Sequence, residues 1–91
     1  MNNITAIAKA IHQLKSDKEV RQLLNELFTQ SELDTLSKRW CILNMLNQGI
    51  TQRDIAQKLN VSLCKITRGA KILKNKKNII QRFLKGNKEN E

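Results

Sequence analysis

Apolar side chains recur three or four residues apart along nearly the whole chain, and this spacing limits the fold more than any other feature. In the first run, Ile4, Ile7, Ile11 and Leu14 lie on one face of a helix. The 91 residues include no proline and only three glycines, so few positions would break a helix. The sequence therefore predicts an all-α fold, a single domain over residues 1–91 with six short helices, no strand and no repeat.

Several polar residues and one glycine mark where these helices begin and end. Ser16 and Thr29 are each followed three residues later by a glutamate, which is the pattern of a capping box at a helix start. Gly49 favours a helix end. The last helix is expected to begin near Asn75 and to fade before a frayed tail at residues 86–91.

The apolar faces of the first three helices are wide for so small a chain. In the helix after Thr29, Ile42 and Met45 broaden the apolar stripe. Because a chain of this length has a limited core of its own, a homodimer is predicted, in which the second subunit covers the remaining faces. The residues of this helix that are expected to face inward are Leu33, Leu36, Trp40, Leu43 and Leu46.

The charge of the chain is large and unevenly distributed. Seventeen Lys and Arg residues against eight Asp and Glu residues give a net charge of +9. Residues 1–54 carry seven basic and six acidic side chains, whereas residues 55–88 carry ten basic and no acidic ones. Such a cluster of cations is typical of a nucleic-acid-binding protein. A cationic amphipathic protein on an anionic membrane is the alternative from another class.

Other classes of protein find little support in the sequence. Cys41 and Cys64 lie 23 residues apart beside a single histidine, which is too few ligands for a zinc site, so two free and partly buried thiols are expected. No nucleophile–base pair, glycine-rich phosphate loop or carboxylate cluster points to an enzyme. No apolar run is long enough to span a bilayer, and the N-terminus lacks a secretory signal, so a cytoplasmic protein is expected.

Residues 51–73 fit a helix-turn-helix through six matching places. Ile55 and Ile66 anchor the two helices on the core, and the small Ala56 lies where the helices cross. Asn60 occupies the turn, where a positive φ is needed and asparagine tolerates it better than most residues. An ordinary helical hairpin with a tight turn is the alternative interpretation.

In a helix-turn-helix the first helix crosses the DNA backbone and the second enters the major groove. Lys65 would donate to guanine O6 or N7, and Leu63 would contact a thymine methyl group. Gln52 and Arg53 are suited to phosphate contacts. The predicted DNA-binding residues are Gln52, Arg53, Ser62, Leu63, Cys64, Lys65, Thr67 and Arg68. The lysines at positions 58, 71, 74, 76 and 77 would add sequence-independent attraction, or are simply solvated.

Residues 26–74 resemble the tryptophan repressor family. The resemblance is carried by TQRDIA followed by ITRG, by the preceding Thr-x-x-Glu helix start, and by Arg39 in the helix after it. It implies an intertwined, all-helical homodimer that binds double-stranded operator DNA when L-tryptophan, its corepressor, sits between the core and the DNA-reading helices. The expected function is that of a transcriptional repressor of tryptophan-metabolism genes.

The resemblance also implies which residues hold the ligand. Arg39 would pack its guanidinium on the indole ring. Arg68 would meet the carboxylate, with the Thr29 hydroxyl beside it and Gly69 in the same motif. The ligand-binding residues expected on this basis are Thr29, Arg39, Arg68, Gly69 and Ile72, without any metal or further cofactor.

Two positions depart from the family pattern. Ile72 stands where the family has a serine that helps to hold the ligand ammonium, and Lys65 replaces a threonine of the DNA-reading helix. Backbone carbonyls at Glu26 and Phe28 would still be available to the ammonium. A relative that responds to a different effector, or to none, is therefore the alternative within the same class.

Overall fold

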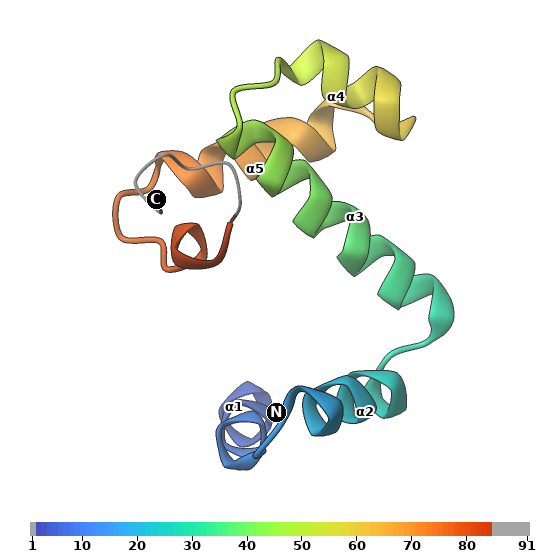
Figure 1. Cartoon of the computed structure of the whole chain (residues 1–91), viewed down its shortest axis with the longest axis vertical. Coiled ribbons are helices and arrows are strands. Elements are labelled where there is room, and N and C mark those ends of the chain that lie inside the picture. Colours follow the sequence, from blue (N-terminus) through green and yellow to red (C-terminus); the bar gives the residue numbers. More distant parts are fainter. Residues whose placement is uncertain (1, 85–91) are drawn as a thin grey trace. The chain divides into compact units, whose positions relative to one another are not determined.

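The structure, a computed structural model, describes residues 2–84, and within this range it is all-α, as predicted (Figure 1). Its helices are α1 (Ile4–Gln13), α2 (Asp17–Leu27), α3 (Gln30–Asn47), α4 (Gln52–Leu59), α5 (Leu63–Lys74) and the 3-10 helix η1 (Ile80–Phe83). None of these helices could cross a membrane, given their lengths and polarity. The frayed tail predicted at residues 86–91 lies outside the described residues.

Side-chain caps begin the helices where the sequence predicts them. At α3, the Glu32 N–H donates to Thr29 Oγ1 at 3.1 Å, and the Thr29 N–H donates to Glu32 Oε1 at 2.9 Å, which completes a capping box. At α2, the Ser16 hydroxyl accepts from the Glu19 N–H at 3.2 Å. The Glu19 carboxylate accepts instead from the Lys15 N–H at 2.7 Å, one residue earlier than in a capping box.

The predicted end of α3 at Gly49 is also confirmed. Gly49 has a φ of +90°, a conformation that residues with a Cβ rarely adopt. The Ile50 N–H donates to the Met45 carbonyl at 3.1 Å, and the Gly49 N–H donates to the Leu46 carbonyl at 3.0 Å. These two bonds form a Schellman motif, which satisfies the last carbonyls of α3 and turns the chain toward α4.

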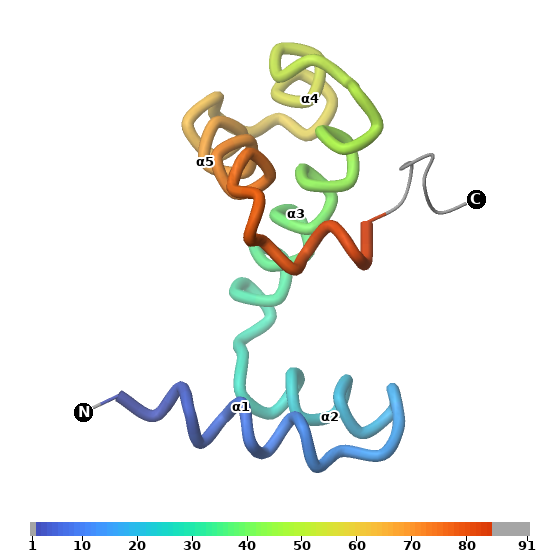
Figure 2. The backbone as a smooth tube through the Cα atoms, turned by 90° about the vertical axis from the view of Figure 1, so that its left-hand side faces the viewer, coloured from blue at the N-terminus to red at the C-terminus, as the bar shows by residue number. Residues whose placement is uncertain are grey.

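The contacts within one chain form two compact units, Met1–Asp34 and Thr35–Glu91, and the division falls inside α3. In the first unit α2 follows α1 after a short connection (Figure 2). Neither helix has a single buried residue. The large apolar side chains of Ile4, Ile11 and Leu27 are exposed, at 66%, 41% and 51%. These two helices therefore leave their amphipathic faces uncovered within their own unit.

The core of the second unit joins three helices. Ile42 of α3, Ile55 of α4 and Ile66 of α5 are buried together. Half-buried apolar side chains surround them, namely Met45, Leu46, Ile50, Ala56, Leu59 and Val61. Because α4 and α5 each contribute a fully buried isoleucine, both helices are held in a fixed arrangement on the C-terminal half of α3.

The inward-facing stripe predicted for α3 is only partly correct within one chain. Leu43 is buried, and Leu33 and Leu46 are half-buried. Leu36 and Trp40, however, are exposed. The prediction fails at these two residues because no other described segment of the unit Thr35–Glu91 packs on that part of the α3 surface.

The α-helix predicted from about Asn75 does not form. Local side-chain hydrogen bonds compete with it, since Asn75 Oδ1 accepts from the Lys77 N–H at 3.0 Å and Asn78 Oδ1 accepts from the Gln81 N–H at 3.1 Å. Only the four residues of η1 are helical after this turn. Gln81 Nε2 then donates to Asn47 Oδ1 at 3.3 Å, which ties the segment to the end of α3.

Candidate nucleic-acid interface

Two helices joined by a three-residue turn form the centre of the site. The Thr51 hydroxyl caps α4 by accepting from the Asp54 N–H at 3.2 Å. Asn60 ends the helix with φ +54° and ψ +51°, the left-handed conformation that the sequence predicts for the turn. The Val61 N–H then donates to the Ala56 carbonyl at 3.2 Å and brings the chain back against α4. α4 and α5 are therefore two helices joined by a tight turn, which supports the prediction of a helix-turn-helix at residues 51–73.

The buried Ile66 fixes which residues of α5 face solvent. With Ile66 fully buried, the other residues at the beginning of α5 and just before it are exposed, namely Ser62, Leu63, Cys64, Lys65, Thr67 and Arg68. Leu63 keeps 54% of its surface exposed, although it is apolar. The structure thus presents the predicted DNA-reading residues outward.

Two details of this surface differ from the sequence-based expectation. Cys64 is exposed and only Cys41 is half-buried, so the expectation of two partly buried thiols is wrong for Cys64, which lies on the outward face of α5. The sequence also allows Ser62 to cap α5, and its backbone has the conformation of an N-cap, yet its hydroxyl makes no capping hydrogen bond. That hydroxyl is consequently not used to stabilise the helix.

The first turn of α4 is linked directly to α5. The Thr67 hydroxyl lies 3.3 Å from Gln52 Oε1 and 2.9 Å from the Leu63 carbonyl oxygen. Gln52 and Arg53 are both exposed. The predicted phosphate-binding residues of α4 therefore share a surface with the outward side of α5. This link could not be predicted from the sequence, because the two residues lie 15 positions apart.

The electrostatic character of this surface is strongly positive. From residue 55 to residue 84 the chain has no acidic side chain. The basic residues of α4 and α5 within that range are all exposed, namely Lys58, Lys65, Arg68, Lys71 and Lys74. Asp54 in the first turn of α4 is the one acidic residue of these two helices, and the excess of positive charge attracts polyanions such as nucleic-acid backbones.

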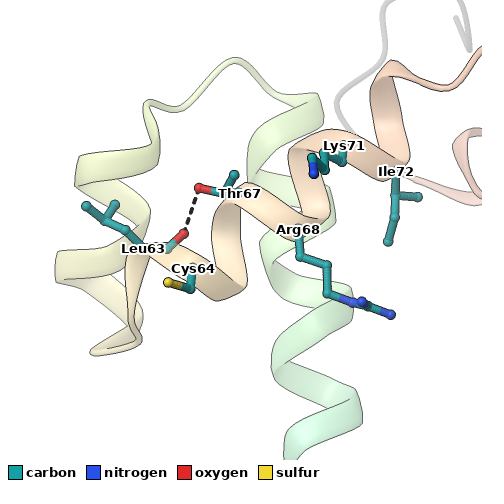
Figure 3. Close-up of a pocket in the computed structure, with 6 residues that line it drawn as sticks. All are labelled: Leu63, Cys64, Thr67, Arg68, Lys71 and Ile72. Carbon is teal, nitrogen blue, oxygen red and sulfur yellow. Dashed lines mark hydrogen bonds between the residues drawn. The ribbon is translucent and has the colours of Figure 1, made fainter.

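A hollow of about 570 Å³ lies along the outward side of α5 (Figure 3). It is lined by Leu63, Cys64, Thr67, Arg68, Lys71 and Ile72. The Arg68 and Ile72 side chains point from α5 to the same side of the helix (Figure 3). The lining combines two cationic side chains with apolar ones and includes no carboxylate. Such a lining suits a ligand that carries an anionic group on an apolar body.

The structure brings together only some of the ligand-binding residues predicted from the family. Arg68 and Ile72 both line the hollow, and Arg39 is exposed on α3 outside that lining. Gly69 is buried, and a Cβ atom at this position would lie 3.3 Å from side-chain atoms of Ile42 and Leu46. Thr29 belongs to the unit Met1–Asp34, where its hydroxyl caps α3.

Lys71 also lines the hollow, although the sequence predicted for it no more than a sequence-independent attraction to DNA. The spacing of Lys71 from other lining residues along the sequence could have indicated its position in the hollow. Residues 63, 67 and 71, and residues 64, 68 and 72, each follow one another at intervals of four, so they form one face of a helix.

Comparisons with known proteins agree with this geometry. The family model described as "Trp repressor protein" matches residues 2–88. A Trp operon repressor homolog of Xylella fastidiosa is 38% identical over 80 residues, which covers 87% of this chain and 85% of that protein. A homolog of the same description from Vibrio campbellii is 38% identical over 71 residues, which covers 77% of this chain and 71% of that protein. Another from Chlamydia trachomatis is 35% identical over 63 residues, which covers 68% of this chain and 67% of that protein. No solved structure is significantly similar to the chain.

Proposed function

The chain belongs to the Trp repressor family and is thereby a DNA-binding transcriptional regulator and not an enzyme, and from this premise we propose that it is a sequence-specific repressor that binds operator DNA. The observation that carries this proposal is the outward face of α5. Leu63 and Lys65 are exposed there, while the neighbouring Ile66 is fully buried and anchors the helix to the core. A rigid helix with exposed cationic and apolar side chains at its N-terminal end is what major-groove reading needs.

The proposed contacts divide between the two helices. Gln52 and Arg53 of α4 bind phosphates, which position the protein on the duplex. Leu63 and Lys65 of α5 meet base edges, the first at a thymine methyl group and the second at guanine O6 or N7. The remaining predicted residues, Ser62, Cys64, Thr67 and Arg68, lie on the same outward surface and complete the proposed interface.

We propose a homodimer in which two chains intertwine into one domain. The support comes from apolar surface that one chain leaves uncovered. Neither α1 nor α2 buries any residue, and Leu36 and Trp40 of α3 are exposed. Exposed apolar faces of this extent mark an interface, and a two-fold dimer covers the same faces on both chains.

L-Tryptophan is the proposed corepressor. Arg68, on the hollow of α5, offers a cation for the carboxylate, and Arg39 offers a flat guanidinium for the indole ring. Thr29 and the backbone carbonyls of residues 26–28 would complete the site, with Gly69 keeping α5 close to α3. The relatives' names describe repressors of the Trp operon, which supports tryptophan metabolism as the controlled process.

A specific observation favours a second candidate, a repressor with a different effector or none. Ile72 is 37% exposed and lines the hollow beside Arg68. An isoleucine offers no hydrogen-bond acceptor to the ammonium group of an amino acid. A ligand without an ammonium group would therefore lose no hydrogen bond at this position.

One experiment tests the proposed function directly. The full chain is used to select duplexes from random-sequence DNA, with and without L-tryptophan, and the enriched duplexes are then tested for binding. The proposal predicts an enriched two-fold-symmetric sequence that is bound more tightly with L-tryptophan. Enrichment that does not depend on L-tryptophan would favour the second candidate. Absence of enrichment, together with co-sedimentation with anionic vesicles, would favour the membrane alternative. We also propose a cytoplasmic location, because a repressor acts where its operator DNA lies.

A further inference from the structure

The hollow on α5 is lined by two cationic side chains, and their charge bears on which ligands it favours. We propose that the hollow prefers a carboxylate that carries no ammonium group, and that Lys71 acts with Arg68 to hold this carboxylate. The inference rests on the proposed function, because it concerns the effector site of the repressor. It names the class of ligand that the second candidate leaves open.

The two cations of the lining lie close together along α5. Arg68 and Lys71 are three residues apart, which makes them neighbours on the surface of a helix. Both side chains are exposed to solvent. An arginine offers two parallel N–H donors to a carboxylate, and a lysine adds a compact charge on a flexible stem. We therefore assign the direct hydrogen bonds to Arg68 and the additional attraction to Lys71.

Negative charge that could receive an ammonium group is missing from this part of the surface. Among the described residues that line the hollow there is no carboxylate. Asp54 is the one acidic residue of α4 and α5, and it does not belong to the lining. An anion in the hollow is attracted by two cations, whereas an ammonium group in the same place is repelled by both.

The lining also has few oxygen atoms that could accept a hydrogen bond from an ammonium group. Ile72, which points to the same side of α5 as Arg68, has an apolar side chain (Figure 3). The one side-chain oxygen of the lining is that of Thr67, whose hydroxyl donates to the Leu63 carbonyl at 2.9 Å. Gln52 Oε1 lies 3.3 Å from the same oxygen and leaves it less accessible to a ligand. On the α5 side of the site, an ammonium group therefore loses water without gaining a partner beside Arg68.

The apolar part of the lining indicates the rest of the ligand. Leu63 and Ile72 are 54% and 37% exposed, so both offer apolar surface to a bound molecule. An apolar or aromatic body would cover this surface and gain from leaving water. The favoured ligand is thus a carboxylic acid with an apolar or aromatic body and a net charge of about −1 at neutral pH.

The test compares three ligands by calorimetry on the full chain without DNA. L-Tryptophan and indole-3-propionate share the indole ring and the carboxylate, and only L-tryptophan has the ammonium group. We expect indole-3-propionate to bind about tenfold more tightly, which corresponds to one missing hydrogen bond to a charged group. Tryptamine keeps the ammonium group but has no carboxylate, and it should produce no heat of binding.

Three variants separate a role in ligand choice from a merely structural one. Lys71→Gln should weaken indole-3-propionate about two- to fivefold and reduce the salt dependence of its binding. Lys9→Gln, at an exposed lysine of α1, removes the same charge and should bind like the wild type. Ile72→Ser should tighten L-tryptophan about tenfold and leave indole-3-propionate unchanged, whereas a structural disturbance would change both ligands alike.

Each failure has a distinct meaning. If the wild-type protein binds L-tryptophan as tightly as indole-3-propionate, the inference is overturned and the proposed corepressor stands. If Lys71→Gln behaves like Lys9→Gln, the role assigned to Lys71 is overturned. If neither ligand binds, the proposed effector site fails together with this inference, while the selection of duplexes from random-sequence DNA still tests DNA binding by itself.

Discussion

Gly69 of α5 lies so close to Ile42 of α3 that a Cβ atom at position 69 would be 3.3 Å from Ile42 Cγ2. Leu46 Cδ1 would be at the same distance. The glycine thus allows α5 to pack directly on α3, and this contact sets how far the neighbouring Arg68 stands from the core. The requirement is one of space, because Gly69 lies inside a helix.

Gly69→Ala should therefore lower the stability of the fold. An alanine gains about 1 kcal/mol of helix propensity over glycine, whereas overpacking a core contact costs about 1–3 kcal/mol. We expect the free energy of unfolding in urea to fall by up to about 2 kcal/mol. An increase would mean that Ile42 and Leu46 move aside without cost.

Lys65 and Lys76 should differ in what they contribute to DNA binding. Lys65 is exposed at the start of α5, whereas Lys76 is exposed in the turn after it. Lys65→Ala should reduce discrimination at one base pair by about 1–3 kcal/mol, because a base-edge contact is lost. Lys76→Ala should weaken matched and scrambled duplexes alike. Identical behaviour of the two variants on both duplexes would contradict the assignment of α5 as the reading helix.

Unfolding should depend on protein concentration. If a second chain covers α1, α2 and the exposed side of Trp40, folding and association are linked, and the melting temperature rises with concentration. Thermal melts at several concentrations, together with light scattering, measure this directly. A monomeric mass at micromolar concentration with a melting temperature that does not change would argue against the dimer.

Tryptophan binding should be selective but weakened. Ile72 replaces a hydroxyl that would accept from the ligand ammonium, and the loss of a hydrogen bond to a charged group is worth about 1.5–3 kcal/mol, or roughly ten- to a hundredfold in affinity. Calorimetry should show that Ile72→Ser tightens binding of L-tryptophan. Arg68→Ala should abolish it, and Arg39→Ala should reduce it strongly. No heat at saturating L-tryptophan would favour the second candidate.

Local chemistry explains which parts of the fold could be predicted from the sequence. The capping box at Thr29, the stop at Gly49 and the left-handed turn at Asn60 each depend on residues within a few positions of one another. The buried isoleucines of the helix-turn-helix follow from helical spacing. The structure has each of these features, and it leaves the residues that we propose to read DNA exposed to solvent.

Features that depend on distant parts of the chain, or on competing local bonds, could not be predicted in this way. The spacing of α3 does not reveal that Leu36 and Trp40 are left uncovered within their own unit. Asn75 and Asn78 form side-chain bonds to the backbone that end the expected last helix after a short turn. The contact between Gln52 and Thr67 joins two helices and has no signature in either alone.

The dependence of DNA affinity on salt tests the central claim most directly, because the claim is that the basic surface of α4 and α5 binds the DNA backbone. If the dimer contacts roughly 6–10 phosphates, the affinity for a selected duplex should fall about 10³- to 10⁵-fold between 50 and 200 mM salt. An affinity that hardly changes over this range would contradict the proposal that this surface is the DNA interface.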